Sequence, residues 1–132
     1  MQTPAKKSIL VVDDDYDYLL QMKMFLASSG FDVTTANSQK EAENIVKLLR
    51  PDLVILDLMM ERHDAGFTLC NHIKNLYPDM PIIIASAVTS ETGLMFDLVS
   101  QEDKDWIKAD VFLDKSIRKD QLYREISKLL KL

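Results

Sequence analysis

The chain has 132 residues, of which 47% are hydrophobic and 28% are charged, and its formal net charge at pH 7 is −5. This composition is typical of one soluble globular domain and excludes a disordered or fibrous chain. The negative charge argues against direct nucleic-acid binding, because such proteins need a basic face to displace counterions. No apolar run approaches the roughly 20 residues that a membrane-spanning helix needs. The single cysteine, Cys70, fits a reducing compartment, and we expect a cytoplasmic protein without a membrane partner.

Short apolar runs recur along the chain, and most of them end at a polar residue. Continuous runs of aliphatic residues are typical of strands that are buried on both faces of a parallel sheet. The intervening segments place apolar residues at helical spacing. The predicted strands are residues 8–12, 31–36, 54–57, 81–85 and 111–113. The predicted helices are about 15–29, 38–50, 64–77 and a last segment around 122–130, with one more suggested after Ser90.

Single residues mark where these helices begin and end. Gly30 can adopt the left-handed conformation that ends a helix. Ser38, with Glu41 three residues later, forms a capping box, and Asp64 can cap the third helix. Pro78 ends that helix, because proline cannot continue one.

Five strands that alternate with five helices predict an α/β fold with a parallel sheet. Right-handed crossovers and short connections leave few topologies. We expect the flavodoxin-like doubly wound sheet of five strands in the order 2-1-3-4-5, in which ligands bind beyond the carboxyl ends of the strands. Residues 1–132 then form one domain with a core of about 7–131.

Polar residues follow four of the predicted strands at these carboxyl ends. They are Asp13 and Asp14 after the first strand, Asp57 at the third, Ser86 after the fourth and Lys115 after the fifth. Each has an ordinary explanation by itself: acids are favoured at a helix N-terminus, and a serine or lysine after a strand is usually a turn or surface residue. Their occurrence together at one edge of the sheet favours a functional site.

Three carboxylates at one point repel one another, and a divalent cation relieves that repulsion. Carboxylate oxygens suit Mg²⁺. Asp57 can serve as a nucleophile toward a phosphoryl group, while Lys115 neutralises charge on the phosphoryl oxygens and Ser86 donates a hydrogen bond to them. The residues therefore predict a site that accepts a phosphoryl group with the help of Mg²⁺.

Four segments contain these residues: ILVVDDD at 9–15, VILDLMM at 54–60, IIIASA at 82–87 and VFLDK at 111–115. Together, in this order and over essentially the full chain, they resemble a two-component response-regulator receiver domain of the stand-alone type. The resemblance implies that Asp57 accepts a phosphoryl group from a sensor histidine kinase or a phosphotransfer protein. It also implies no enzyme activity beyond the protein's own phosphoryl uptake and slow self-dephosphorylation.

The resemblance assigns the Mg²⁺ ligands around Asp57. Asp14 would bind the metal directly and Asp13 mainly through water, and the backbone carbonyl of Met59 would complete the protein ligands.

The resemblance also implies a switch. Ser86 would be the switch hydroxyl, Lys115 the lysine that contacts the phosphate, and Phe112 the aromatic residue whose rotamer follows the switch. Phosphorylation would then shift an equilibrium of the surface formed by the fourth helix, the fifth strand and the fifth helix. We expect a downstream protein to bind this surface, and a second copy of the chain is one partner that this hypothesis allows. No output domain is expected in this chain.

Three features depart from the family pattern. Ser116 stands after Lys115 where the family usually has proline with a cis bond, and we expect a cis bond here as well, so that the lysine reaches the phosphate. The loop at 60–66 differs from the usual Met-Pro and Asp-Gly pattern, and the stretch between Ser86 and Lys115 is longer than usual. The longer stretch lies next to the face that many family members use for partners, so it leaves the choice of partner open.

Met59 and Val88 lie two residues beyond Asp57 and Ser86, where family members tune the approach of hydrolytic water. Both are apolar here. We therefore expect slow self-dephosphorylation.

Two alternatives remain open. A degenerate receiver would bind partners without ever carrying phosphate. A phosphatase of the haloacid-dehalogenase type also places an aspartate nucleophile after its first strand, and Asp13 and Asp15 match its motif while Asp17 does not.

Overall fold

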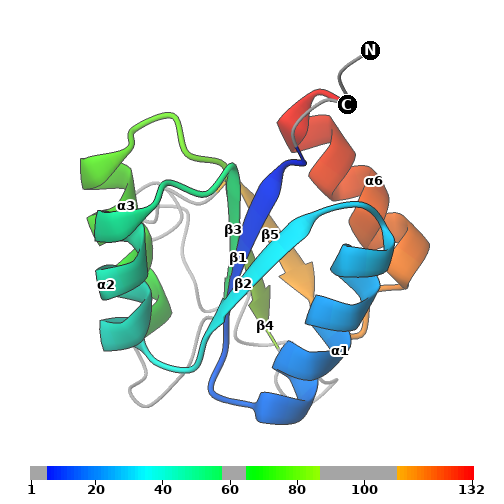
Figure 1. Ribbon diagram of the computed structural model, residues 1–132, viewed down its shortest axis with the longest axis horizontal. Coiled ribbons are helices and arrows are strands. Elements are labelled where there is room, and N and C mark those ends of the chain that lie inside the picture. Colours follow the sequence, from blue (N-terminus) through cyan, green and yellow to red (C-terminus); the bar gives the residue numbers. More distant parts are fainter. Residues whose placement is uncertain (1–5, 58–64, 87–109) are drawn as a thin grey trace.

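The computed structural model describes residues 6–57, 65–86 and 110–132, and these residues form a parallel sheet between two layers of helices (Figure 1). The five strands have the order β2-β1-β3-β4-β5, which confirms the predicted fold class and topology. The strands are β1 (Ser8–Val12), β2 (Asp32–Ala36), β3 (Leu53–Asp57), β4 (Ile82–Ser86) and β5 (Val111–Asp114). The helices in this part of the chain are α1 (Tyr16–Ser28), α2 (Gln39–Leu48), α3 (Ala65–Leu76) and α6 (Lys119–Leu130). The helix suggested after Ser90 lies outside the described residues.

The predicted helix boundaries are largely confirmed. Asp15 is the N-cap of α1, and Gly30 follows the end of that helix with a φ of 99°. Ser38 caps α2, because its side chain accepts a hydrogen bond from the backbone N–H of Glu41 at 3.1 Å. The helix is shorter than predicted, since Leu49 has an extended backbone and is 47% exposed. No helix among the described residues is both long and apolar enough to cross a membrane.

Both faces of the sheet are buried, as is expected when helices cover a parallel sheet on two sides. Side chains alternate along β1, so that Leu10 and Val12 lie in one core cluster and Ile9 and Val11 lie in the other. The first cluster includes residues of α2 and α3, and the second includes residues of α1 and α6. Figure 1 shows these helix pairs on opposite sides of the sheet. Each fully buried aliphatic side chain contributes roughly 1.5–3 kcal/mol, so these two layers hold the strands in place.

The strand register aligns the carboxyl ends of neighbouring strands. Val12 of β1 pairs with Leu56 of β3, so Asp13 and Asp57 come next at the same level of the sheet. Asp57 in turn pairs with Ala85 of β4. The buried core of the sheet therefore fixes where the acidic residues lie.

The left-handed backbone at the end of α1 gives a test of the fold. Gly30→Ala is expected to lower the free energy of unfolding by about 1 kcal/mol, because a φ of 99° is unfavourable for a residue with a Cβ atom. Apart from the two adjoining residues, no atom lies within 4 Å of where the Cβ of alanine would be. The loss of stability would therefore come from backbone strain and not from a steric clash. Urea unfolding followed by circular dichroism measures it.

Gly30→Asn is the matched variant for this test. Asparagine tolerates a left-handed backbone better than alanine, so its cost should be smaller. Equal stability of the wild type and Gly30→Ala would contradict the assignment of strain to this residue.

Candidate functional site

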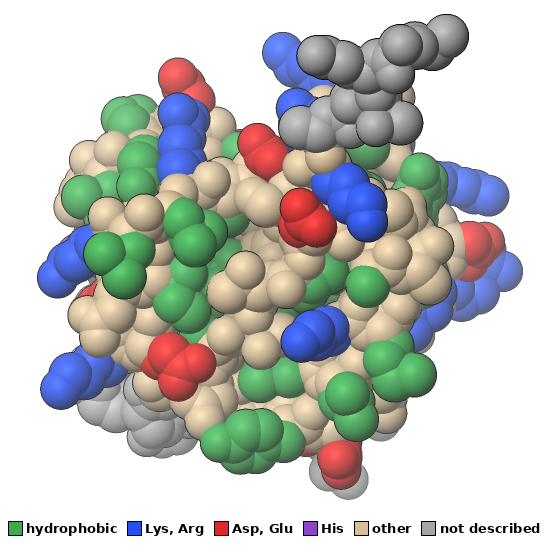
Figure 2. Space-filling view, in the orientation of Figure 1, with side chains coloured by type: hydrophobic (Ala, Val, Ile, Leu, Met, Phe, Trp, Pro, Cys, Tyr) green, Lys and Arg blue, Asp and Glu red, His purple; other side chains and the backbone are tan. Residues whose placement is uncertain are grey.

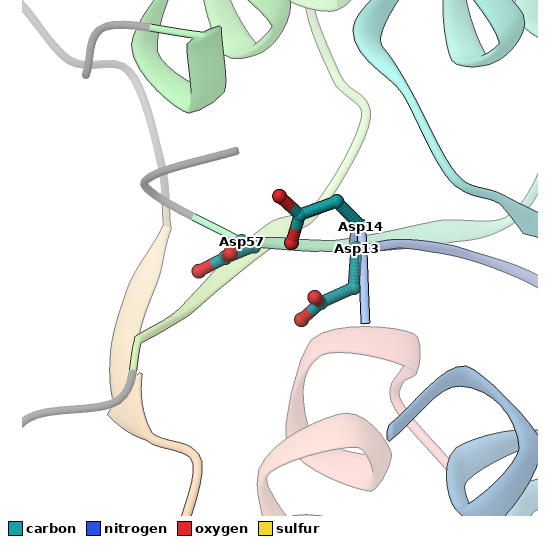
Figure 3. A group of neighbouring side chains, drawn as sticks. All are labelled: Asp13, Asp14 and Asp57. Carbon is teal, nitrogen blue, oxygen red and sulfur yellow. The ribbon is translucent and has the colours of Figure 1, made fainter. Parts of the chain in front are cut away.

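Three carboxylates meet at the carboxyl ends of β1 and β3. Asp13 and Asp14 directly follow β1, and Asp57 is the last residue of β3. One oxygen from each lies within 4.8 Å of the others. Figure 3 shows the three carboxyl groups gathered around a common space. Asp13 and Asp57 are 0% and 6% exposed, whereas Asp14 faces solvent.

The run of three acids after β1 serves two different purposes. Asp13 is held in place because its backbone N–H donates to the carbonyl of Ala36, while its Oδ1 accepts a hydrogen bond from the N–H of Asp15 at 2.9 Å. The side chain of Asp15 accepts hydrogen bonds from the N–H groups of Asp17 and Tyr18 and so caps α1. The helix-terminus interpretation of this run is therefore confirmed for Asp15. Asp13 and Asp14 belong instead to the group of three neighbouring carboxylates, and their functional role stays a prediction.

Lys115 reaches this acidic cluster from the end of β5. Its Nζ lies 2.5 Å from Oδ2 of Asp13 and 3.5 Å from Oδ2 of Asp57. The lysine side chain is only 18% exposed, so these ion pairs are partly shielded from water. The predicted meeting of Asp13, Asp14, Asp57 and Lys115 is present in the structure.

The prediction of a cis bond between Lys115 and Ser116 is wrong. The described residues contain no cis peptide bond. The turn is held by Asp114, whose Oδ1 accepts hydrogen bonds from the N–H and the hydroxyl of Ser116, both at 2.9 Å. Lys115 contacts Asp13 and Asp57 although the bond to Ser116 is trans, so a cis bond is not needed for its ammonium to reach the carboxylates.

Burial and charge together change the proton affinity of the cluster. Burial raises the pKa of Asp13, and the hydrogen bond and the charge of Lys115 offset this only in part. Burial by itself lowers the pKa of Lys115, but the hydrogen bond with Asp13 and the charge of Asp57 outweigh it and leave the pKa raised. Among the residues that the structure describes, one ammonium thus faces three carboxyl groups, so this described set has more acidic than basic groups.

This donor set fits a magnesium ion. The three carboxylates offer hard oxygen ligands within one small space, with a buried and an exposed side. Mg²⁺ is bound by a few carboxylates and keeps several water molecules, which the exposed side at Asp14 allows. A divalent cation also supplies the positive charge that Lys115 alone does not.

Three other predicted site residues have different outcomes. β4 ends at Ser86, beside Asp114 in the register, so its backbone lies at the expected edge, but its side chain is outside the described part of the structure. Met59 also lies outside the described residues. Phe112 is partly buried and packs against the core cluster under α2 and α3. The switch roles of Ser86 and Phe112 stay predictions.

Tyr18 also lies at the acidic cluster, although the sequence pattern did not predict it. The ring centroid of Tyr18 lies 4.7 Å from Nζ of Lys115. Burial raises the pKa of Tyr18 strongly, and the charges of Asp13 and Asp57 raise it further, which shows how close the phenol lies to the cluster. The available signal was an aromatic residue in the first turn of a helix that directly follows the acidic run.

Known proteins share this sequence pattern. Residues 9–127 match the response regulator receiver domain. The transcriptional regulatory protein GlrR of Escherichia coli (strain K12) is 35% identical over 122 residues, which are 92% of this chain and 26% of that protein. The response regulator MprA of Mycolicibacterium vanbaalenii is 31% identical over 123 residues, which are 93% of this chain and 50% of that protein. The chain thus spans 26% to 50% of the length of these two relatives.

Solved structures share the fold. A response regulator receiver domain protein (CheY-like) from Methanospirillum hungatei JF-1 has a TM-score of 0.81 at 23% identity, covering 96% of this chain and 95% of that chain. A response regulator receiver domain protein from Clostridium thermocellum has a TM-score of 0.76 at 26% identity, covering 95% and 94%. The matching sequence over residues 9–127, the shared fold and the acidic cluster at the strand ends lead to one conclusion: this chain belongs to the response-regulator receiver-domain family.

Proposed function

We propose that Asp57 accepts a phosphoryl group from a sensor histidine kinase or a phosphotransfer protein, and that this uptake requires Mg²⁺. One observation carries the proposal: the buried carboxylate of Asp57 shares its space with Asp13 and Asp14 and lies 3.5 Å from the ammonium of Lys115. A carboxylate that could act as a nucleophile, oxygens that could bind a metal and a positive charge thus lie together, which supports the proposal.

The chemistry assigned to each residue follows from its position. An oxygen of Asp57 forms a bond to phosphorus as the bond from phosphorus to the donor nitrogen or oxygen breaks, and the donor keeps that electron pair. Lys115 neutralises charge on the phosphoryl oxygens, for which its contacts with Asp13 and Asp57 already position the ammonium. Mg²⁺, held by Asp13, Asp14 and Asp57 and by the backbone carbonyl of Met59, would supply further positive charge to those oxygens.

The loss of the phosphoryl group is proposed to be slow. Met59 and Val88, on which this hypothesis rests, lie outside the described residues. The protein would then catalyse only its own phosphorylation and dephosphorylation. We propose a cytoplasmic site of action, in keeping with the buried Cys70.

An exposed apolar stripe on α1 supports contact with a phosphodonor protein. Tyr16, Leu20 and Met24 are 69%, 58% and 65% exposed, and their spacing of four places them on one face of the helix. A hollow of 260 Å³ lies between α1 and the Asn37 segment, and Tyr16 and Leu20 line it. Figure 2 shows hydrophobic side chains at the surface in the region of α1. Because α1 begins directly after the acidic run, a protein on this stripe would lie beside Asp57.

The output surface is proposed from the same family resemblance. This is the surface expected from the fourth helix, the fifth strand and the last helix. The structure describes the strand as β5 and the last helix as α6, and the fourth helix lies outside the described residues. The relatives are named as transcriptional regulators and response regulators, and the chain spans half of their length or less. A downstream protein, or a second copy of the chain, is the partner proposed for this surface.

The geometry gives little support to a phosphatase of the haloacid-dehalogenase type. Such an enzyme would need Asp15 beside Asp13 in the site, but the Asp15 carboxylate caps α1. The degenerate receiver is the second candidate, and the first experiment decides between it and a phosphoacceptor.

Incubation with acetyl phosphate and Mg²⁺ is expected to add one phosphoryl group to the wild-type chain, seen as a single mass increase by intact-mass spectrometry. Asp57→Asn should show no increase, because the amide is not a nucleophile of this kind. Omission of Mg²⁺ should reduce the labelled fraction at least tenfold. No labelling under any condition would favour the degenerate receiver, and a half-life of seconds for the label would contradict slow self-dephosphorylation.

The metal site gives a second test that does not depend on phosphorylation. Mg²⁺ at ten times its dissociation constant is expected to stabilise the folded protein by about 1.4 kcal/mol, because the site exists only in the folded state. Thermal unfolding with and without Mg²⁺ measures this shift. Asp14→Asn should remove most of it.

Asp32→Asn is the matched control for the metal experiment. Asp32 is also an exposed aspartate, but it stands at the opposite end of the sheet, at the start of β2. Its variant should keep the Mg²⁺ shift of the wild type. Equal loss in both variants would mean that the shift does not report this site.

The α1 stripe gives a third test. Leu20→Asp is expected to slow transfer from a phosphorylated histidine phosphotransfer protein at least tenfold, while labelling by acetyl phosphate stays unchanged. Leu48→Asp, at a leucine that is 86% exposed at the end of α2, is the control and should slow neither reaction. Equal rates of protein transfer for Leu20→Asp and the wild type would exclude the stripe as the docking surface.

A further inference from the structure

Among the described residues, the ammonium of Lys115 has three neighbours of two chemical kinds. Two are carboxylates, with Nζ 2.5 Å from Asp13 and 3.5 Å from Asp57. The third is the aromatic ring of Tyr18, whose centroid lies 4.7 Å from Nζ. A cation over the face of an aromatic ring at this distance is attracted by the quadrupole of the ring, and the attraction grows when the pair is shielded from water.

The ring of Tyr18 is held in this position by the start of α1. The backbone N–H of Tyr18 donates to the N-cap side chain of Asp15 at 3.3 Å. The ring is partly buried and packs against the core cluster that includes Leu19 and Met22. Tyr18 therefore presents a fixed apolar face to the acidic cluster.

The two carboxylate partners of Lys115 are the groups that the proposed reaction engages. Asp57 becomes the phosphoryl acceptor, and Asp13 belongs to the set of oxygens that fits Mg²⁺. A hard cation prefers these oxygens and does not bind an aromatic face. Among the described partners of Lys115, Tyr18 is thus the one that would neither bind the metal nor react with the phosphoryl group.

We propose that Tyr18 is a positioning residue, which keeps the ammonium of Lys115 beside Asp57 when the carboxylates are engaged in phosphoryl transfer. This inference rests on the proposed function of Asp57. A lysine has a flexible four-carbon stem, so an ammonium without a fixed partner would spread over many rotamers. The ring would limit that spread while leaving Nζ free to turn its protons toward the phosphoryl oxygens.

Two substitutions separate the ring from the hydroxyl. Tyr18→Phe keeps the aromatic face and should label with acetyl phosphate within twofold of the wild-type rate. Tyr18→Leu keeps an apolar side chain but has no π face, and at saturating Mg²⁺ it should label about tenfold more slowly. The Mg²⁺ concentration at half-maximal thermal shift should be the same in all three proteins, because the ring is not a ligand.

A spectroscopic measurement tests the contact without any phosphorylation. The Cε protons of Lys115, assigned with Lys115→Met, should be shifted upfield by the ring current of Tyr18. This shift should persist when Mg²⁺ is added. It should remain in Tyr18→Phe and be lost in Tyr18→Leu.

A second aromatic residue of α1 that contacts a lysine, here Lys119 of α6, supplies the matched control. Nζ of Lys119 lies 5.5 Å from the ring centroid of Phe25, which also packs against the core but is not among the residues of the acidic cluster. Phe25→Leu should label with acetyl phosphate at the wild-type rate. A loss equal to that of Tyr18→Leu would show a general effect of removing an aromatic residue from α1, and would overturn the proposal.

The outcomes separate this inference from the proposed function. If the wild type is labelled but Tyr18→Leu is labelled equally fast at saturating Mg²⁺, Asp57 is the acceptor and the role of Tyr18 is refuted. If the wild type is never labelled, the proposed function fails, and the ring-current shift in the presence of Mg²⁺ still decides whether Tyr18 holds Lys115. Loss of that shift on addition of Mg²⁺ would refute the inference in either case.

Discussion

The unequal charge at the carboxyl ends of β1 and β3 is the constraint on which the site depends. In the described part of the chain, three carboxylates share a space of a few ångströms with the ammonium of one lysine, and Asp13 and Asp57 are buried. Burial makes each uncompensated charge costly, so the cluster favours any further positive charge that can enter. The same shortage of positive charge explains why Lys115 contacts Asp13 and Asp57 at once.

The sheet topology decides which residues can share this space. The strand order places β4 and β3 between β5 and β1, so Lys115 must cross two strand ends to reach Asp13. Only a long side chain can span this distance. The hydrogen bonds between Ser116 and Asp114 fix the turn from which the Lys115 side chain extends toward Asp13. The acids, in contrast, need only short side chains, because β1 and β3 are neighbours with aligned ends.

Much of the fold and of the site could be predicted because the apolar runs define strands, and the residue after each run then lies at a known edge. Asp13, Asp57 and Lys115 were found in this way. Tyr18 was missed because its contact depends on how α1 is rotated against the sheet, which the spacing of residues along one helix does not define.

The trans bond was missed for a related reason. The expectation of a cis bond came from a family pattern with proline, while the turn in this chain is held by a local hydrogen bond from Ser116 to Asp114. Leu49 shows that spacing along the sequence does not define where a helix ends. Its position fits the apolar face of α2, but the helix ends at Leu48 and Leu49 has an extended backbone.

The order of events during folding follows from the way the cluster is assembled. Asp13, Asp57 and Lys115 come from the beginning, the middle and the end of the chain, and only the paired strands bring them together. Contacts between such distant segments form late, because the entropy of closing the long intervening loops must first be overcome. A growing or partly folded chain would therefore hold Asp57 without its neighbours, and the phosphoryl uptake proposed for Asp57 would then be inefficient. The proposed reaction would be restricted to molecules whose sheet is complete.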